Sequence, residues 1–153
     1  MSECCNTKEQ ISEMSDSGIC PACMLLGKKV KLLTVKSMLK PAALSSLYAD
    51  TDHYFCSISN CDVVYFDTNK KIYSISDIKV PVHQKDVSLK VPVCYCFDWT
   101  KEKIIKSVEK ELKPNPIDHI RENIKENRCG CEVNNPQGSC CLGNVTKFMN
   151  QLS

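Results

Sequence analysis

The sequence predicts an α+β protein, with a small β-rich unit in its first half and a helical unit in its second half. The first half is divided into short runs of β-branched and aromatic residues, whereas the second half repeats isoleucine at helical spacing. Twelve cysteines in 153 residues fall mostly in close pairs. These pairs are Cys4–Cys5, Cys20–Cys23, Cys56–Cys61, Cys94–Cys96, Cys129–Cys131 and Cys140–Cys141.

The first half is expected to contain a tail and a β-rich unit. Residues 1–18 are polar and lack periodicity, so we expect a flexible tail. Residues 19–90 are expected to form the β-rich unit, which ends in a linker at 81–91 that carries Pro81 and several charges. Its predicted elements are a strand at Val30–Val35, a short helix from Pro41, a hairpin of His53–Cys56 and Asp62–Phe66, and strands at Lys71–Ile75 and Ile78–Val80.

The second half, residues 91–153, is expected to be a helical unit with a cysteine-bearing segment at each end. Thr100 is a suitable N-cap for the first helix, and Pro114 and Pro116 would end that helix. Isoleucines spaced three and four residues apart predict a second helix after these prolines. The predicted helices are Lys101–Leu112, a second from Ile117 to about Asn127, and a closing helix over Leu142–Met149.

Composition excludes several classes of protein. The 20 basic and 18 acidic residues are interspersed and give a formal net charge of +2, so no nucleic-acid partner is expected. The first ten residues contain acids and no apolar segment, which predicts no secretory signal. No stretch approaches the ~18 apolar residues of a membrane span, so we expect no membrane insertion. We therefore expect a cytoplasmic protein, in which dense cysteines favour metal sites over disulfides as the stabiliser of small cores.

The first cysteine set predicts a zinc site. Cys20 and Cys23 form a Cys-Pro-x-Cys knuckle, and Cys56 and Cys61 supply a distal pair. Two such pairs suit a tetrahedral four-thiolate Zn2+ site, which holds a fold together and does no chemistry. His53 lies close enough in the sequence to replace one thiolate, but a packed histidine is the simpler reading of that position.

The second cysteine set leaves two possibilities open. Cys94-Tyr-Cys96 places one residue between two sulfurs, and four further cysteines follow after the two predicted helices. Helices that return the chain would gather thiolates around a [2Fe-2S] cluster, and spacing alone allows a second zinc equally well. The amides of Gly138 and of the start of the last helix are expected near Cys141, where they would raise the reduction potential of a cluster.

Longer motifs carry a resemblance to known families. The segment Pro92-Val-Cys-Tyr-Cys-Phe97 with its Thr-capped helix resembles [2Fe-2S] domains of the bacterioferritin-associated ferredoxin (BFD) type. Residues 19–149 resemble the N-terminal domain of the CopZ copper chaperones. The motifs that carry this resemblance are Cys20-Pro-x-Cys23, Phe55-Cys56-x4-Cys61-Asp-Val-Val-Tyr-Phe66, Pro92-Val-Cys-Tyr-Cys96 and Cys131-x2-Asn-Asn-Pro-x-Gly-x-Cys-Cys141.

The resemblance implies one zinc and one [2Fe-2S] cluster. Carried over residue by residue, it implies zinc at Cys20, Cys23, Cys56 and Cys61, and the cluster at Cys94, Cys96, Cys131 and Cys141. Cys129 and Cys140 are then spare. The resemblance also implies copper trafficking, in which the cluster reduces Cu(II) to Cu(I) and the copper passes to a thiolate acceptor.

The sequence departs from the family in one respect. The family's separate copper carrier has a Met-x-Cys-x-x-Cys loop that this sequence lacks. We therefore expect Cu+ to be received from a copper-binding domain or copper-export ATPase in trans, or held by a soft-metal handle at Cys4 and Cys5. The electron donor is not implied by any motif.

Two other functions compete with copper trafficking. One is a stand-alone ferredoxin-like electron carrier, and the other is a redox or metal sensor that is not dedicated to copper. The sequence favours an electron-transfer or metallochaperone protein over an enzyme, because it has no HExxH motif and no nucleophile–histidine–acid spacing. His83 and His119 are isolated in the sequence, and Trp99 is expected to pack over the second cysteine set.

Overall fold

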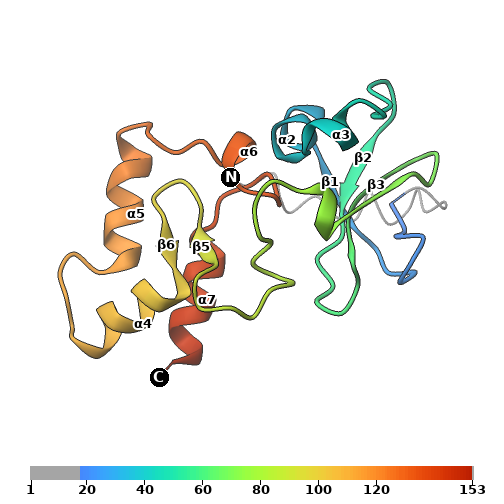
Figure 1. The fold of residues 1–153 in the computed structure, drawn as a ribbon. Helices are drawn as coiled ribbons and strands as arrows, with labels where there is room; N and C mark the ends of the chain where they lie inside the picture. Colours follow the sequence, from blue (N-terminus) through green and yellow to red (C-terminus); the bar gives the residue numbers. More distant parts are fainter. Residues whose placement is uncertain (1–17, 153) are drawn as a thin grey trace.

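The computed structural model describes residues 18–152 and shows two lobes side by side (Figure 1). One lobe is a four-stranded antiparallel sheet in the order β1-β2-β3-β4 with short helices beside it. Its elements are β1 (Lys28–Val30), α2 (Leu32–Met38), α3 (Pro41–Leu44), β2 (His53–Phe55), β3 (Val63–Asp67), β4 (Ile72–Ser74) and the 3-10 turn η2 (Ile75–Asp77). The α+β class and the early position of the sheet are confirmed.

The second lobe is mostly helical, as predicted. Its elements are β5 (Pro92–Cys94), β6 (Trp99–Thr100), α4 (Lys101–Glu109), α5 (Pro116–Lys125), α6 (Cys131–Asn134) and α7 (Leu142–Gln151). Thr100 caps α4, because its hydroxyl accepts the Lys103 amide at 3.1 Å. The side chain of Asn115 caps α5 in the same way, accepting the Asp118 amide at 2.8 Å.

The predicted hairpin around the second cysteine pair is confirmed. Strands β2 and β3 are antiparallel, with Tyr54 opposite Phe66. Every residue of β3 is buried, because this central strand has the hydrophobic core on one face and the first cysteine set on the other. The core beside it contains Val35, Leu39 and Tyr65, all fully buried.

The predicted strand at Val30–Val35 is wrong. Strand β1 ends at Val30, and helix α2 begins at Leu32. The helix buries Thr34, Val35 and Met38 on one face. Burial of that face outweighs the weak preference of the β-branched residues for a strand.

Two smaller boundaries also differ from the sequence prediction. Ile78–Val80 is not a strand, and Ile78 makes only an isolated bridge to Leu39. Helix α4 ends at Glu109 instead of Leu112, because Glu111 adopts a positive φ of 49° that a helix does not tolerate.

The chain crosses between the lobes more than once. After the linker, the Tyr95 hydroxyl donates to the Pro81 carbonyl at 2.7 Å and accepts the His83 amide at 2.9 Å. Later, the segment at and after α6 returns to the sheet lobe, where the buried Tyr65 hydroxyl donates to the Pro136 carbonyl. Gly138 approaches Thr34 at a positive φ of 74°, which is favourable only for glycine. These contacts fix the second cysteine segment against the first lobe.

Within residues 18–152, no helix has the length and apolar character that a membrane span requires.

Candidate metal centres

The first cysteine set is built by two loops of the sheet lobe. The first loop is a tight knuckle, in which the Met24 amide donates to the Cys20 carbonyl at 2.8 Å and the Cys20 amide to the Leu25 carbonyl at 2.9 Å. The second loop joins β2 to β3 and carries Cys56 at its start and Cys61 near its end. The Cys56 amide donates to the Val64 carbonyl at 2.8 Å, which fixes this cysteine at the base of the hairpin.

The four thiols of these loops converge on one point. The Sγ atoms of Cys20 and Cys61 lie 3.9 Å apart, and those of Cys23 and Cys56 lie 3.8 Å apart. All four Sγ atoms lie within 4.8 Å of one another. One ion bound by four thiolates at about 2.3 Å would separate the sulfurs by about 3.8 Å. The donor set and its spacing therefore fit a tetrahedral ion such as zinc.

The site is closed, because its thiols are mostly buried and an aromatic ring packs against them. Cys20, Cys56 and Cys61 are buried, and Cys23 is half-buried. Phe66 packs against this set and stacks on Tyr54 with ring centroids 5.4 Å apart. A Cβ on Gly27 would lie 2.7 Å from the Phe66 ring, so only glycine fits where the knuckle passes this ring. A site without an open position holds a structure together.

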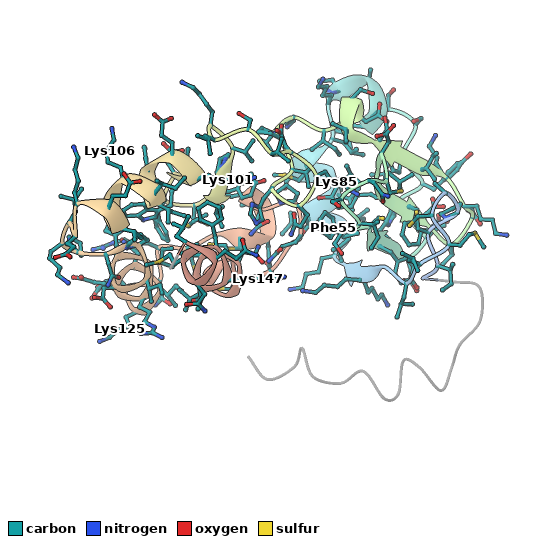
Figure 2. The ribbon with its side chains drawn as sticks, turned by 90° about the horizontal axis from the view of Figure 1, so that it is seen from below. Phe55, Lys85, Lys101, Lys106, Lys125 and Lys147 are labelled. Atoms are coloured by element: carbon teal, nitrogen blue, oxygen red, sulfur yellow. The ribbon has the colours of Figure 1, made fainter. Side chains whose placement is uncertain are left out.

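Lys85 is a site residue that the sequence reasoning missed. Its ammonium group donates to the carbonyls of Ile58 (2.6 Å) and Cys61 (2.8 Å) and lies 3.9 Å from Cys56 Sγ. Figure 2 shows Lys85 where the two lobes meet. A four-thiolate zinc site carries a net negative charge, which a neighbouring cation offsets. A lysine in a loop far along the chain gives no sequence signal for this contact.

Burial disfavours the thiolate form of two thiols of the first set, Cys56 and Cys20. Burial raises the pKa of the Cys56 thiol to about 12, while the Ile58 amide and the Lys85 charge act in the opposite direction. Burial also raises the pKa of Cys20. Buried thiols of this kind become thiolates when a metal cation replaces their protons.

His53 is not part of the cysteine group. It lies on β2, and only 1% of its surface is exposed. Burial lowers its pKa. The described metal-binding group consists of the four cysteines, so the packed histidine is the interpretation that agrees with the structure.

The second cysteine set is gathered from three elements of the helical lobe. Cys94 ends β5, Cys96 follows in the turn, Cys131 begins α6 and Cys141 is the N-cap of α7. The Sγ atoms of Cys96 and Cys131 lie 3.6 Å apart. Cys94 and Cys141 are both buried and belong to the same hydrophobic cluster. Unlike the first quartet, these sulfurs do not all lie within 4.8 Å of one another in the described structure.

Hydrogen bonds and neighbouring thiols affect the charge on the sulfurs of the second set. The Gly130 amide donates to Cys96 Sγ at 3.1 Å, and the Asn134 side-chain amide donates to the same sulfur at 3.6 Å. Interactions with the thiols of Cys141 and then Cys96 lower the pKa of Cys131 to about 3. The same interaction with Cys131 raises the pKa of Cys141. Cys131 is therefore the sulfur that carries negative charge most readily.

The sequence predicts that the amide of Gly138 and the amides at the start of the last helix lie near Cys141, and the structure shows different hydrogen-bond partners for them. The Gly138 amide donates to the Asn135 carbonyl at 2.8 Å. The Leu142 amide, at the start of α7, donates to Cys140 Sγ at 3.4 Å. The prediction is wrong for Gly138, because the loop folds back on itself at Asn135, and the Gly130 amide donates to a cysteine of this set instead.

The other residues that the sequence analysis singled out lie in different surroundings. Cys129 and Cys140 are exposed, and the ten described cysteines are all free thiols. Cys4 and Cys5 lie outside the described residues. His119 is isolated only in the sequence, because the Trp99 indole N–H donates to its Nδ1 at 3.1 Å. Trp99 packs against the core that contains Cys94 and Cys141, as predicted.

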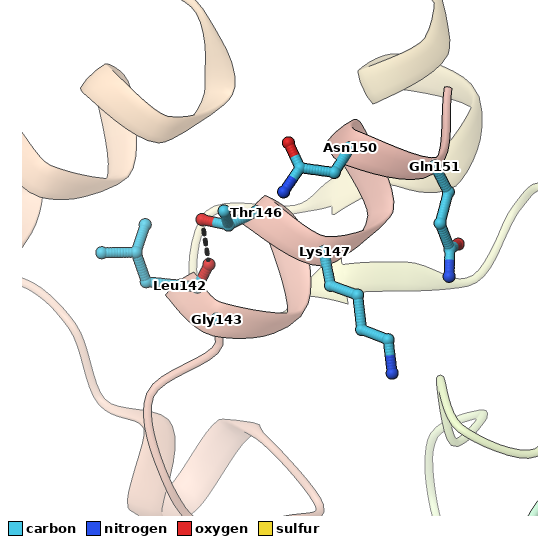
Figure 3. Close-up of a pocket in the computed structure, with 6 residues that line it drawn as sticks. All are labelled: Leu142, Gly143, Thr146, Lys147, Asn150 and Gln151. Atoms are coloured by element: carbon cyan, nitrogen blue, oxygen red, sulfur yellow. Dashed lines mark hydrogen bonds between the residues drawn. The ribbon is translucent and has the colours of Figure 1, made fainter. Parts of the chain in front are cut away.

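A groove of about 620 Å³ follows the exposed side of α7 (Figure 3). The Thr146 hydroxyl bonds to the Leu142 carbonyl at 2.9 Å and is thus used inside the helix. The lining contains no thiol, carboxylate or imidazole, so this groove is not a metal centre. Its residues are Leu142, Gly143, Thr146, Lys147, Asn150 and Gln151.

Comparisons with known proteins agree with the site and the fold. A family model described as the CopZ zinc binding domain matches residues 17–79, which contain the whole first quartet. Copper chaperone CopZ of Archaeoglobus fulgidus is 32% identical over 122 residues, which are 80% of this chain and 57% of that protein. This chain thus spans less than two thirds of the relative's length.

A solved structure extends the likeness to the second lobe. The X-ray structure of the Archaeoglobus fulgidus CopZ N-terminal domain matches with a TM-score of 0.69 and 29% identity, over 84% of this chain and 95% of that one. The chain is therefore homologous to the CopZ N-terminal domain over most of its length, and its residues 17–79 match the zinc binding domain of the CopZ type.

Proposed function

We propose that this chain is a CopZ-type metal-binding redox protein that carries one Zn2+ and one [2Fe-2S] cluster and takes part in copper trafficking. The observation that supports this most directly is the pair of cysteine quartets. One is compact and closed, and the other is wider and supplied with N–H donors.

The zinc ligands in this proposal are Cys20, Cys23, Cys56 and Cys61. Their sulfur spacing matches a single tetrahedral ion. The family match at residues 17–79 supports the choice of zinc as the metal. Lys85 offsets the negative charge of the four thiolates and fixes the carbonyls of the loop that carries two of them.

The cluster ligands in this proposal are Cys94, Cys96, Cys131 and Cys141. Two iron atoms need thiolates over a wider span than one ion does, and the second quartet does not form a group within 4.8 Å among the described residues, as the first does. When bound, a [2Fe-2S] cluster supplies one-electron chemistry, such as the reduction of Cu(II) to Cu(I). Gly130 and Asn134 donate N–H groups to Cys96 and so stabilise negative charge on its sulfur.

We infer that the lobes correspond to two subdomains, a zinc-binding one at residues 19–90 and a BFD-like one at residues 91–153. Separate hydrophobic clusters support this division, because two are drawn from residues 20–82 and the third from residues 93–149. The free thiols suit the reducing cytoplasm. Copper would pass to a copper-binding domain or export ATPase in trans, with Cys4 and Cys5 as a further soft-metal handle.

Metal analysis of anaerobically purified protein tests the proposal. We expect about two iron, two sulfide and one zinc per chain, with an EPR signal in the reduced state. Two zinc ions and a colourless protein would overturn the cluster and leave a binding module.

A copper assay separates copper trafficking from its alternatives. Reduced protein is mixed anaerobically with Cu(II), and Cu(I) is measured with a selective chelator. Copper trafficking predicts stoichiometric Cu(I) on the protein. If Cys4→Ser with Cys5→Ser abolishes this binding, the tail is the handle. Electron loss from the cluster without retained Cu(I) would favour the ferredoxin-like carrier.

A further inference from the structure

The helical lobe contains a cavity that the metal sites do not use. Its volume is about 340 Å³, within the usual size range of small-molecule sites. Trp99 and His119 form an aromatic wall, Leu112 adds an apolar surface, and Lys106 and Lys113 lie at the rim. The cavity thus combines an aromatic surface with positive charge.

A buried hydroxyl without a partner lines this cavity. Only 3% of Ser107 is exposed, and its Oγ makes no hydrogen bond to any residue in the range 18–152. Serine on a helix commonly bonds back to the carbonyl four residues earlier, as Ser37 does to Leu33 at 2.8 Å. A buried hydroxyl without a bond destabilises the fold. Because Ser107 lines the cavity, a small rotation of its side chain would bring the hydroxyl to a bound ligand.

Three lysines line the cavity, and two of them have no acidic partner among the described residues. The ion pairs of the described residues are Lys29–Asp52, Lys31–Glu132 and Lys103–Asp98. Lys106 and Lys113 take part in none of these three. A ligand that enters between these two lysines would therefore be favoured if it carried negative charge.

The aromatic wall is held in place. The Trp99 indole N–H donates to His119 Nδ1 at 3.1 Å, and the two rings meet edge to face with centroids 5.7 Å apart. Phe97 packs edge to face on the other side of the same imidazole at 6.1 Å. A fixed aromatic surface loses little entropy when a flat ring packs against it.

We propose that this cavity binds a small molecule in which a flat aromatic ring carries an anionic group. The ring packs at Trp99, the anion lies between Lys106 and Lys113, and Ser107 donates a hydrogen bond. Trp99 pairs with Cys94 across β5 and β6. A redox-active ring would thus lie beside the second cysteine set, a consequence that rests on the proposed cluster, whereas the binding itself does not.

Calorimetric titration with flavin mononucleotide as the probe tests the binding. Riboflavin offers the ring without the phosphate, and inorganic phosphate offers the anion alone. We expect flavin mononucleotide to bind at least about tenfold more tightly than either one. Trp99 is the only tryptophan of the chain, so its fluorescence should change on binding. Equal affinity for riboflavin, or no binding of any probe, would overturn the proposal.

Three variants assign the binding to this cavity. Lys106→Gln combined with Lys113→Gln should weaken binding about tenfold. Lys125→Gln is the matched control, because Lys125 lies on the opposite side of the lobe (Figure 2), and it should leave binding unchanged. Ser107→Ala should weaken binding severalfold without lowering the melting temperature, since it removes an unbonded hydroxyl. Unchanged affinity in both cavity variants would contradict the assignment.

The result can be separated from the proposed function. Affinity is measured together with the iron content of the same sample. Loss of probe binding in protein with full iron refutes the cavity proposal alone. Probe binding in protein without iron refutes the cluster alone.

Discussion

The two lobes gather the same kind of side chain into two different sites. In the sheet lobe, two loops bring four sulfurs within 4.8 Å of one another. In the helical lobe, a strand, the turn after it and two helix starts carry the four cysteines of the second set, and the Sγ atoms of Cys96 and Cys131 lie 3.6 Å apart. The same residue type thus gives two kinds of site. The positions of the backbone segments that carry the cysteines decide whether the four sulfurs are close enough to bind a single ion.

The two sites also differ in how negative charge is balanced. Near the first set, the ammonium of Lys85 lies 3.9 Å from Cys56 Sγ. At the second set, the amides of Gly130 and Asn134 donate to Cys96. A fixed cation suits a structural site whose charge does not change. N–H donors suit a site whose charge changes on reduction, because they tune the reduction potential.

The largest expected effect breaks the compact site. Cys56→Ser removes a thiolate from the centre of the hairpin, and structural zinc contributes on the order of 10 kcal/mol to folding in small zinc domains. We expect the sheet lobe to lose zinc and unfold, while the helical lobe keeps its helices. Zinc analysis with far-ultraviolet circular dichroism measures both. Retained zinc and an unchanged melting curve would show that this sulfur is not a ligand.

The next effect distinguishes ligands from their neighbours at the second site. Cys141→Ser should lose the visible absorption of a cluster, because Cys141 is a proposed ligand that lies buried in the same hydrophobic cluster as Cys94. Cys140→Ser is the matched control one residue away, and its exposed thiol predicts full iron content. Iron and sulfide analysis after anaerobic purification gives the answer. Equal loss in both variants would reject the assignment of Cys141.

A smaller effect isolates the cation at the compact site. Lys85→Gln keeps hydrogen-bond donors near the Ile58 and Cys61 carbonyls but removes the charge. Substitutions next to metal ligands typically reduce metal affinity about 10-fold to 100-fold. We therefore expect zinc to transfer faster to a competing chelator. Lys90→Gln, on the exposed part of the linker, is the control and should release zinc at the original rate.

The smallest effect concerns the helix starts of the second lobe. Thr100→Ala removes the cap of α4, and Asn115→Ala removes the cap of α5. Each should lower the free energy of unfolding by about 1 kcal/mol. Thr100 also lies in β6, which pairs with the strand that ends at Cys94, so fraying of α4 next to it should in addition lower iron retention. Chemical denaturation and iron analysis check both statements, and identical iron content in the two variants would count against the second.

Much of the fold followed from local patterns. The hairpin of β2 and β3, the proline-initiated α3, the Thr100 cap and the three main helices of the second lobe were predicted. Each depends on signals within a few residues, such as a cap, a proline or a period of 3.6. The wrong strand at Val30–Val35 had no such signal. Its residues suit either state, and packing of Val35 into the core decided for a helix.

The sequence by itself determined that the cysteines come in local groups, because residues a few positions apart in one loop lie close along the backbone. The closest sulfurs nevertheless belong to different groups, as in Cys20 with Cys61, Cys23 with Cys56 and Cys96 with Cys131. Tertiary structure decided how the pairs combine and what surrounds them. The meeting of Cys56 with Lys85, of Cys96 with Gly130, and of Trp99 with His119 joins residues from different loops and helices. Such contacts depend on how distant segments of the chain are placed next to one another, and neither the spacing of motifs nor the composition determines that placement.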